Sequence, residues 1–236
     1  TGSFYYMYMA DRVGGADMFS NALYRKDGGS FEDPGYIKAG EMLQDLVKKG
    51  YFPEGVNSLD EDLSEASSLI YNQKAGMYLM GSWFIGVAKE QYPDMMEQLD
   101  FFVFPAVEDG KGDPSNLVGS PGQDYLSVTS TSENMDAAFK YFTEQLMSES
   151  WVASMIENGY IPPIKGASAM LTDPMLKKSA EYFEAAKRVQ VYYDQFLPPS
   201  VAQAHLDAVQ GLFGLTMTPA DAAKAQEAAL QAELKK

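Results

Sequence analysis

The sequence contains no cysteine, and it has a single histidine, His205, among its 236 residues. Without cysteine the chain has no disulfide scaffold, no cysteine–zinc site and no thiol nucleophile. One histidine argues against a histidine-rich metal site and against a histidine-based catalytic triad. A lone histidine on a helix is usually a surface or packing residue, and we expect that of His205.

Basic residues are scarce, with 18 Lys and Arg against 33 Asp and Glu, which gives a formal charge of −15. Nucleic-acid binding requires clustered cations that displace counterions from phosphates, and the sequence shows no such cluster. An anionic membrane surface is unfavourable as a direct partner for the same reason. The acidity itself mainly favours solubility.

Long apolar runs are also missing. No stretch reaches the length of about 18 apolar residues that a transmembrane helix needs. The opening "TGSFYYMYMADRVGG" has neither the basic start nor the cleavage site of a signal peptide. We expect the chain to begin inside a larger protein.

Helical patterns dominate what is present. The best marked begins at Asp33 and Pro34, carries a buried stripe through Ala39 and Leu43, and ends at Gly50. Ser58 and Glu61 have the spacing of a capping box and predict a helix start there. Further helices are predicted over 3–13, 82–92, 132–149 and 151–157, after Asp173-Pro174, from about Ser200, and from Thr218-Pro219 to 234.

Short apolar runs bounded by helix breakers interrupt this pattern at 75–80 and 100–105, and we interpret both as buried strands, with 123–130 as a third. A strand, a helix and a strand within 75–105 predict a right-handed parallel crossover. The predicted fold class is therefore α/β and helix-rich.

Trp83 is the most informative single residue, because it follows the Gly81-Ser82 break at the end of the predicted strand 75–80. The carboxyl ends of strands in open α/β sheets form ligand crevices, and helix N-terminal amides point there. An indole at this place offers a flat apolar face to a flat ligand such as a sugar ring. The alternative is that Trp83 is simply a core residue.

Two other groups of residues are candidates for ligand contacts. The stretch "GSPGQDY" presents Gln123, Asp124 and Tyr125, which together offer donors and acceptors for hydroxyl groups, although an ordinary turn explains it too. Asp194 follows two tyrosines before "LPP", where aromatic packing is the alternative. The acidic stretches 59–65 and 108–116 do not match a calcium loop, and no metal or cofactor is predicted.

Several motifs in order resemble the family 1 extracellular solute-binding proteins, which serve ABC-type sugar importers. They are "NQKAGMYLMGSW", "FFVFPAVEDGKGDPSN", "GSPGQDYLSVTSTSENMDAAFKYF", "GYIPP", "YYDQFLPP" and "LFGLTMTPADAAKAQEAA". The resemblance covers nearly the whole chain. One departure is Ala220, where the family commonly has an acidic residue after the Thr-Pro turn.

The resemblance implies a type II periplasmic-binding-protein-like fold of two lobes, of which this chain holds mostly the C-terminal one. Residues 1–119 and 161–236 correspond to that lobe, and 120–160 is expected to return to an N-terminal lobe that is otherwise absent.

The implied function is extracytoplasmic binding of a sugar or oligosaccharide, without chemistry on it, for delivery to the transmembrane permease of an ABC importer. The protein is then periplasmic or lipid-anchored at the outer face of the cell membrane. Trp83 matches the family's cleft position, and Gln123, Asp124, Tyr125 and Asp194 complete the expected ligand-binding set. Two alternatives stay open: a carbohydrate-active hydrolase using paired carboxylates, and a helical interaction module without a small ligand.

Overall fold

The computed structural model describes residues 2–119, 126–146 and 148–236. The chain divides into two compact units. Unit 1 comprises 1–80, 102–119 and 186–236, and unit 2 comprises 81–101 and 120–185. Each unit is described separately below.

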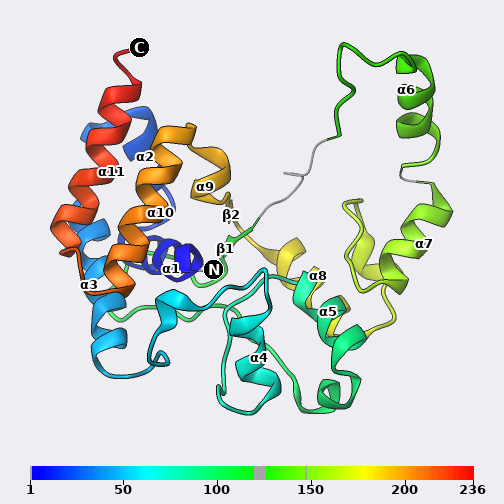
Figure 1. Ribbon diagram of the computed structural model, residues 1–236, viewed down its shortest axis with the longest axis horizontal. Helices are drawn as coiled ribbons and strands as arrows, with labels where there is room; N and C mark the ends of the chain where they lie inside the picture. The colour runs from blue at the N-terminus through cyan, green and yellow to red at the C-terminus, as the bar shows by residue number, and fades with distance from the viewer. Residues whose placement is uncertain (1, 120–125, 147) are drawn as a thin grey trace. The chain divides into compact units, whose positions relative to one another are not determined.

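The regular secondary structure of unit 1 is almost entirely helical (Figure 1). Its helices are α1 (Gly2–Gly14), α2 (Met18–Tyr24), α3 (Pro34–Lys48), α4 (Glu65–Tyr71), α9 (Tyr193–Phe196), α10 (Pro199–Phe213) and α11 (Pro219–Glu233), with the short 3-10 helices η1 (Lys26–Gly28) and η2 (Val56–Ser58). The strands β1 (Leu117–Val118) and β2 (Val189–Gln190) form one parallel pair.

The helix starts of unit 1 follow the capping signals in the sequence. The Asp33 carboxylate accepts a hydrogen bond of 2.8 Å from the Gly35 amide at the start of α3. The Thr218 hydroxyl accepts one of 3.1 Å from the Asp221 amide at the start of α11. A side-chain cap of this kind typically stabilises a helix by about 1 kcal/mol. These helices therefore begin where the sequence predicts.

The core of unit 1 forms where α1 packs against α3 and α10, with α11 covering α3 and α10 (Figure 1). Helix α1 is unusually apolar and aromatic for a surface helix, and its central residues Tyr6 to Ala10 are all buried. A helix that is buried all round belongs at the centre of a unit. Phe19, Phe31 and Tyr193 extend the same core through aromatic contacts.

A polar chain runs through this core. The Nε2 atom of His205 lies 2.7 Å from the Ser3 hydroxyl, and its Nδ1 atom lies 3.1 Å from Oε1 of Gln226. Because a glutamine oxygen only accepts, Nδ1 carries the proton and Nε2 accepts from Ser3. Burial lowers the pKa of His205 to about 4, while the bond to Gln226 and the charge of Asp194 act in the opposite direction. The predicted packing role of His205 is confirmed.

A second buried polar group ties the segment 102–119 to α1. The Arg12 side chain is fully buried and forms an ion pair with Asp11. Its guanidinium also donates to the carbonyls of Phe104 (3.0 Å), Pro105 (3.2 Å) and Asn116 (2.9 Å). A buried charge is tolerated only when it is paired and fully hydrogen-bonded. Arg12 therefore fixes this irregular segment in place.

In the described residues of unit 2, four α-helices surround a smaller core. They are α5 (Trp83–Gln91), α6 (Met135–Glu144), α7 (Glu149–Glu157) and α8 (Pro174–Ala185), with the 3-10 helices η3 (Pro93–Gln98) and η4 (Ala167–Met170). Ile85, Leu171, Leu176 and Ala180 are the buried centre of this core. The Asp173 carboxylate caps α8 by accepting from the Leu176 amide at 2.9 Å.

The predicted strands are wrong where the structure describes them. Residues 75–80 and 100–105 contain no strand, and neither do residues 126–130 of the third predicted strand, so no crossover is built on them. Their apolar runs fit a buried strand, but a strand also requires a neighbouring backbone to pair with, which a sequence run does not reveal. Only β1 and β2 pair among the described residues.

The predicted capping box at Ser58 and Glu61 is also wrong. Helix α4 begins later, at Glu65. The Glu61 carboxylate accepts from the Ser67 amide at 3.1 Å, and the Glu65 carboxylate reaches back to the Asp60 amide at 2.8 Å. The acidic residues do cap the helix start, but with a different register.

No helix among residues 2–119, 126–146 and 148–236 is long and apolar enough to cross a lipid bilayer.

The burial of His205 predicts a pH dependence of stability. In the unfolded chain the imidazole of His205 is protonated near pH 6.5, whereas in the folded protein it stays neutral down to about pH 4. Stabilisation from the neutral ring is thus fully present above pH 6.5 and is lost as the pH falls toward 4, in total about 3 kcal/mol of unfolding free energy.

NMR titration of the only imidazole in the chain measures this pKa directly, and urea unfolding between pH 7 and 4 measures the stability. The His205→Gln variant serves as the control, since its stability should change less over this pH range. An imidazole that titrates near pH 6.5 in the folded protein contradicts the buried, neutral assignment.

Candidate ligand-binding site

Trp83 is the first residue of α5 in unit 2. Its side chain is 39% exposed, although Trp is a residue type that is usually well packed. The helix begins with hydrogen bonds from the Phe84 amide to the Gly81 carbonyl (3.0 Å) and from the Ile85 amide to the Ser82 carbonyl (3.1 Å). The Ser82 hydroxyl makes no capping hydrogen bond to the helix.

The exposure of Trp83 follows from the helix geometry. Ile85 and Ala88 are the buried residues of α5, and Ile85 belongs to the core of unit 2. Two residues along an α-helix correspond to a rotation of about 200°, so Trp83 projects from the side opposite Ile85. The same helix therefore anchors itself through one face and presents the indole on the other.

Gly81 is required for the position of the indole. A Cβ atom at residue 81 would lie 2.0 Å from Cζ3 of Trp83 and 2.3 Å from its Cη2. The six-membered ring of Trp83 thus folds back over the glycine and rests on its backbone. This contact explains why the break before the tryptophan contains a glycine.

Helix α5 is held in place by a backbone crossing and an ion pair. A Cβ atom on Gly159 would lie 2.5 Å from the Cα atom of Gly86, and Gly159 has a φ of +80° that favours glycine. Lys89 forms an ion pair with Asp173. Burial raises the pKa of Asp173, but the bonds to Lys89 and to the Leu176 amide outweigh it, and the pKa lies below the ordinary value.

Asp194, the other described candidate, lies in α9 of unit 1. Its Oδ1 atom is enclosed and has no hydrogen-bond donor among the described residues. A carboxylate oxygen without a donor is costly, so a ligand hydroxyl or a water molecule there would be favourable. Because Asp194 and Trp83 belong to different units, each is placed only within its own unit.

The two tyrosines before Asp194 have packing roles. Tyr193 is 2% exposed and stacks on Phe19, with ring centroids 4.2 Å apart. Tyr192 stacks on Phe4 with centroids 4.9 Å apart. This is the aromatic packing that the sequence offers as the alternative for this stretch. Gln123, Asp124 and Tyr125 lie outside the described residues, and their role stays a prediction.

An aromatic group on unit 1 was missed by the sequence argument. Tyr8 and Phe104 stack almost in parallel, with centroids 4.8 Å apart and planes at 6°, and Arg12 lies 5.2 Å from the centre of the Tyr8 ring. The spacing of Phe4, Tyr8 and Arg12 at every fourth residue of α1 was a signal that they share one face. Phe104 had no such signal, because it comes from an irregular segment.

In the acidic stretch 108–116, Asp113 is engaged by nearby side chains. Asp113 accepts from Lys187 and Ser115, which hold the pKa of its carboxyl well below the ordinary value. Among the described residues, no three His, Asp or Glu side chains are grouped so as to hold a metal ion.

Comparison with known proteins shows which family the chain matches. The profile of the bacterial extracellular solute-binding protein family matches residues 1–168. A search of curated protein sequences finds no match.

Two solved structures resemble the fold. One, from the thermophilic bacterium Caldanaerobius polysaccharolyticus and a study of xylan utilization, has 27% identity and a TM-score of 0.75, with 96% of this chain and 57% of that chain covered. A chitin oligosaccharide binding protein has 23% identity and a TM-score of 0.78, with 98% and 57% covered. This chain therefore spans little more than half the length of these proteins. The likeness confirms the predicted fold class, a helix-rich α/β chain that represents mostly one lobe.

The contact between Gly81 and the indole predicts the effect of a single methyl group. Gly81→Ala should displace the Trp83 ring and cost about 1–3 kcal/mol, as overpacking does. With Trp151→Phe as background, Trp83 is the only tryptophan, and its emission maximum reports the displacement.

Ser82→Ala is the matched control, because the Ser82 hydroxyl makes no capping bond. It should leave emission and stability within about 0.5 kcal/mol of the parent. Equal effects of the two substitutions would show that the indole does not rest on Gly81.

Proposed function

Because this chain belongs to the bacterial extracellular solute-binding protein family, we propose that it binds a sugar or oligosaccharide outside the cytoplasm for delivery to an ABC-type importer. The observation that carries the proposal is the exposed indole at the first turn of α5. The function is capture: the sugar is bound, passed to the transmembrane permease, and not altered.

Trp83 supplies the apolar contact in this proposal. The CH face of a pyranose ring is flat, and it stacks on an aromatic ring that is rigid and open on one side. One part of the indole rests on Gly81 while 39% of the residue's surface stays exposed, which supports this contact. Pre-positioning of this kind lowers the entropy cost of binding.

Polar groups fix the orientation of the sugar. Asp194 is a candidate acceptor for a sugar hydroxyl, and it is placed only within unit 1. Gln123, Asp124 and Tyr125 are assigned to the site from the family resemblance of "GSPGQDY". The family resemblance implies that two lobes close on the sugar by a hinge, and the ligand favours the closed form by its higher affinity for it.

The chemistry of the described residues supports binding without turnover. The lone histidine is fully buried, with both ring nitrogens engaged by Ser3 and Gln226. It is thus unavailable to a substrate as an acid or base. Among acidic residues of the loops, Asp113 is already bonded to Lys187 and Ser115. Incubation of the protein with oligosaccharides distinguishes binding from hydrolysis. A hydrolase would release shortened oligosaccharides, whereas a binding protein would not.

Helix α6 supports a lobe outside this chain. It has an apolar side formed by Met135, Ala138, Phe139 and Phe142, yet none of its residues is buried. Met135 is 43% exposed and Phe139 is 56% exposed. We assign residues 120–160 to a second lobe whose remainder lies outside the chain, as the 57% coverage of the solved structures suggests. That remainder would cover the apolar side of α6.

Removal of the indole should weaken sugar binding. In the longest natural protein that contains this chain, Trp83→Ala should reduce the affinity for its oligosaccharide at least about fivefold, because aromatic stacking contributes about 1 kcal/mol beyond area burial. Isothermal titration calorimetry with xylo- and chito-oligosaccharides measures the change.

Trp151→Phe is the control for this experiment, since Trp151 lies in α7 and is not assigned to the site. Its affinity should equal that of the parent. Unchanged affinity in Trp83→Ala removes Trp83 from the site, and failure of every sugar to bind or to raise the melting temperature moves the function toward a protein interaction module.

The proposal that a second lobe covers the apolar side of α6 has a separate test. In this chain alone, Phe139→Ser should change the unfolding free energy by less than about 0.5 kcal/mol, because Phe139 is exposed. In the longer protein it should cost about 3 kcal/mol or more, the range for a buried phenylalanine.

Lys140→Ser, the neighbouring exposed position, should be near neutral in both proteins. Urea unfolding of the four variants gives the comparison. An equally small effect of Phe139→Ser in both proteins would contradict the assignment of 120–160 to a second lobe.

A further inference from the structure

We propose that the sugar bound by this protein is uncharged, and that the protein discriminates against oligosaccharides carrying uronate or sulfate groups. This inference rests on the proposed function and names the class of ligand for the same site. It is carried by the engagement of the arginines and by the distribution of charge over the two units.

Arginine is the residue best suited to bind carboxylate or sulfate, because its planar fork donates two parallel hydrogen bonds. The sequence has three arginines, Arg12, Arg25 and Arg188. Arg12 is fully buried, and its donors are used by Asp11 and by backbone carbonyls of the segment 104–116. It has no face left for a ligand.

The other two arginines are engaged by carboxylates of unit 1. The two terminal nitrogens of Arg25 lie 2.9 Å and 2.7 Å from the two carboxylate oxygens of Glu227. One of these nitrogens donates a hydrogen bond to Glu227 and the other completes the ion pair, so Glu227 occupies Arg25. Arg188 forms an ion pair of 2.6 Å with Asp17. A sugar carboxylate would compete with a protein carboxylate at both places.

Unit 2, which holds Trp83, has a strong excess of negative charge. Its sequence contains thirteen acidic residues and five lysines, and neither arginine nor histidine. The only cation of α5 is Lys89, which is paired with Asp173. Lys178 donates to Asp100 at 2.6 Å and to the Phe101 carbonyl at 2.8 Å.

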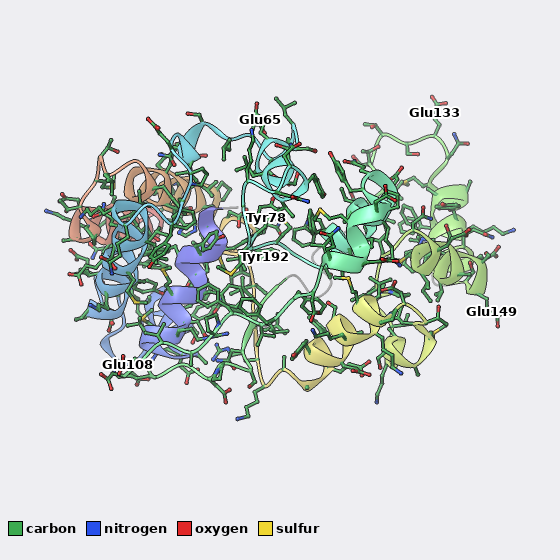
Figure 2. All side chains as sticks on the ribbon, turned by 90° about the horizontal axis from the view of Figure 1, so that it is seen from below. Glu65, Tyr78, Glu108, Glu133, Glu149 and Tyr192 are labelled. Carbon is green, nitrogen blue, oxygen red and sulfur yellow. The ribbon has the colours of Figure 1, made fainter. Side chains whose placement is uncertain are left out.

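The acidic side chains also face the solvent through which a ligand approaches. Glu133 and Glu149 of unit 2, and Glu65 and Glu108 of unit 1, project outward (Figure 2). With a formal charge of −15, the surface potential opposes an anionic ligand and leaves a neutral one unaffected. Salt weakens this repulsion over a distance of about 10 Å at 0.1 M.

Two ligands that differ by one charge test the proposal in the longest natural protein that contains this chain. They are a neutral xylo-oligosaccharide and the same oligosaccharide with one glucuronate substituent, titrated by calorimetry. We expect the acidic ligand to bind at least about tenfold more weakly at 20 mM salt, a gap that narrows at 500 mM salt as screening increases. The affinity for the neutral ligand should not depend on salt. A matched pair of chito-oligosaccharides, with and without one sulfate, repeats the comparison.

A charge variant separates repulsion from simple lack of room for the substituent. Glu90→Lys with Glu97→Lys, two exposed positions of α5 and η3, should raise the affinity for the acidic ligand at low salt and leave the neutral ligand unchanged. Equal or tighter binding of the acidic ligand, or an unchanged gap at high salt and in the variant, overturns the proposal. If none of the four sugars binds, the proposed function fails together with it.

Discussion

The position of Trp83 depends on the packing of its indole ring on Gly81. Helix α5 buries Ile85 in the core of unit 2 and also buries Ala88, and this burial fixes the direction in which Trp83 must point. Gly81 then allows the ring to lie directly on the backbone before the helix. The result is a large aromatic side chain that is rigidly placed yet partly exposed, which is an arrangement suited to a ligand and not to a core. The crossing of Gly86 and Gly159 transmits the same constraint to α7.

In unit 1, buried polar contacts connect the helices to one another and to an irregular segment. His205 connects α1, α10 and α11 through Ser3 and Gln226, and Arg12 connects α1 to the segment 104–116. Both groups are satisfied inside the protein, so they specify how the helices pack and do not take part in chemistry. The engagement of Arg12 by Asp11 and by backbone carbonyls also supports the proposed preference for an uncharged sugar.

The helices and their caps were largely predictable, because Asp33, Asp173 and Thr218 act locally and their spacing alone identifies the starts of α3, α8 and α11. The start of α4 was not, since Glu61 and Glu65 cap it in a register that several acidic residues could have provided. The predicted strands at 75–80 and 100–105 were wrong, because strand pairing depends on backbone that is distant in the sequence.

For the candidate site, the position of Trp83 at the start of a helix was predictable. Its contact with Gly81 and the aromatic group of Tyr8 and Phe104 were not, because ring positions follow from packing that a linear pattern does not contain.

The central claim is that Trp83 touches the sugar, and the emission of this one residue tests it most directly. In the longest natural protein that contains this chain, with every other tryptophan replaced by phenylalanine, oligosaccharide is added while tryptophan fluorescence and heat of binding are recorded on the same sample. The account predicts a saturable change in Trp83 emission with the same dissociation constant as the calorimetric one. Calorimetric binding that leaves both the intensity and the maximum of Trp83 emission unchanged would contradict it.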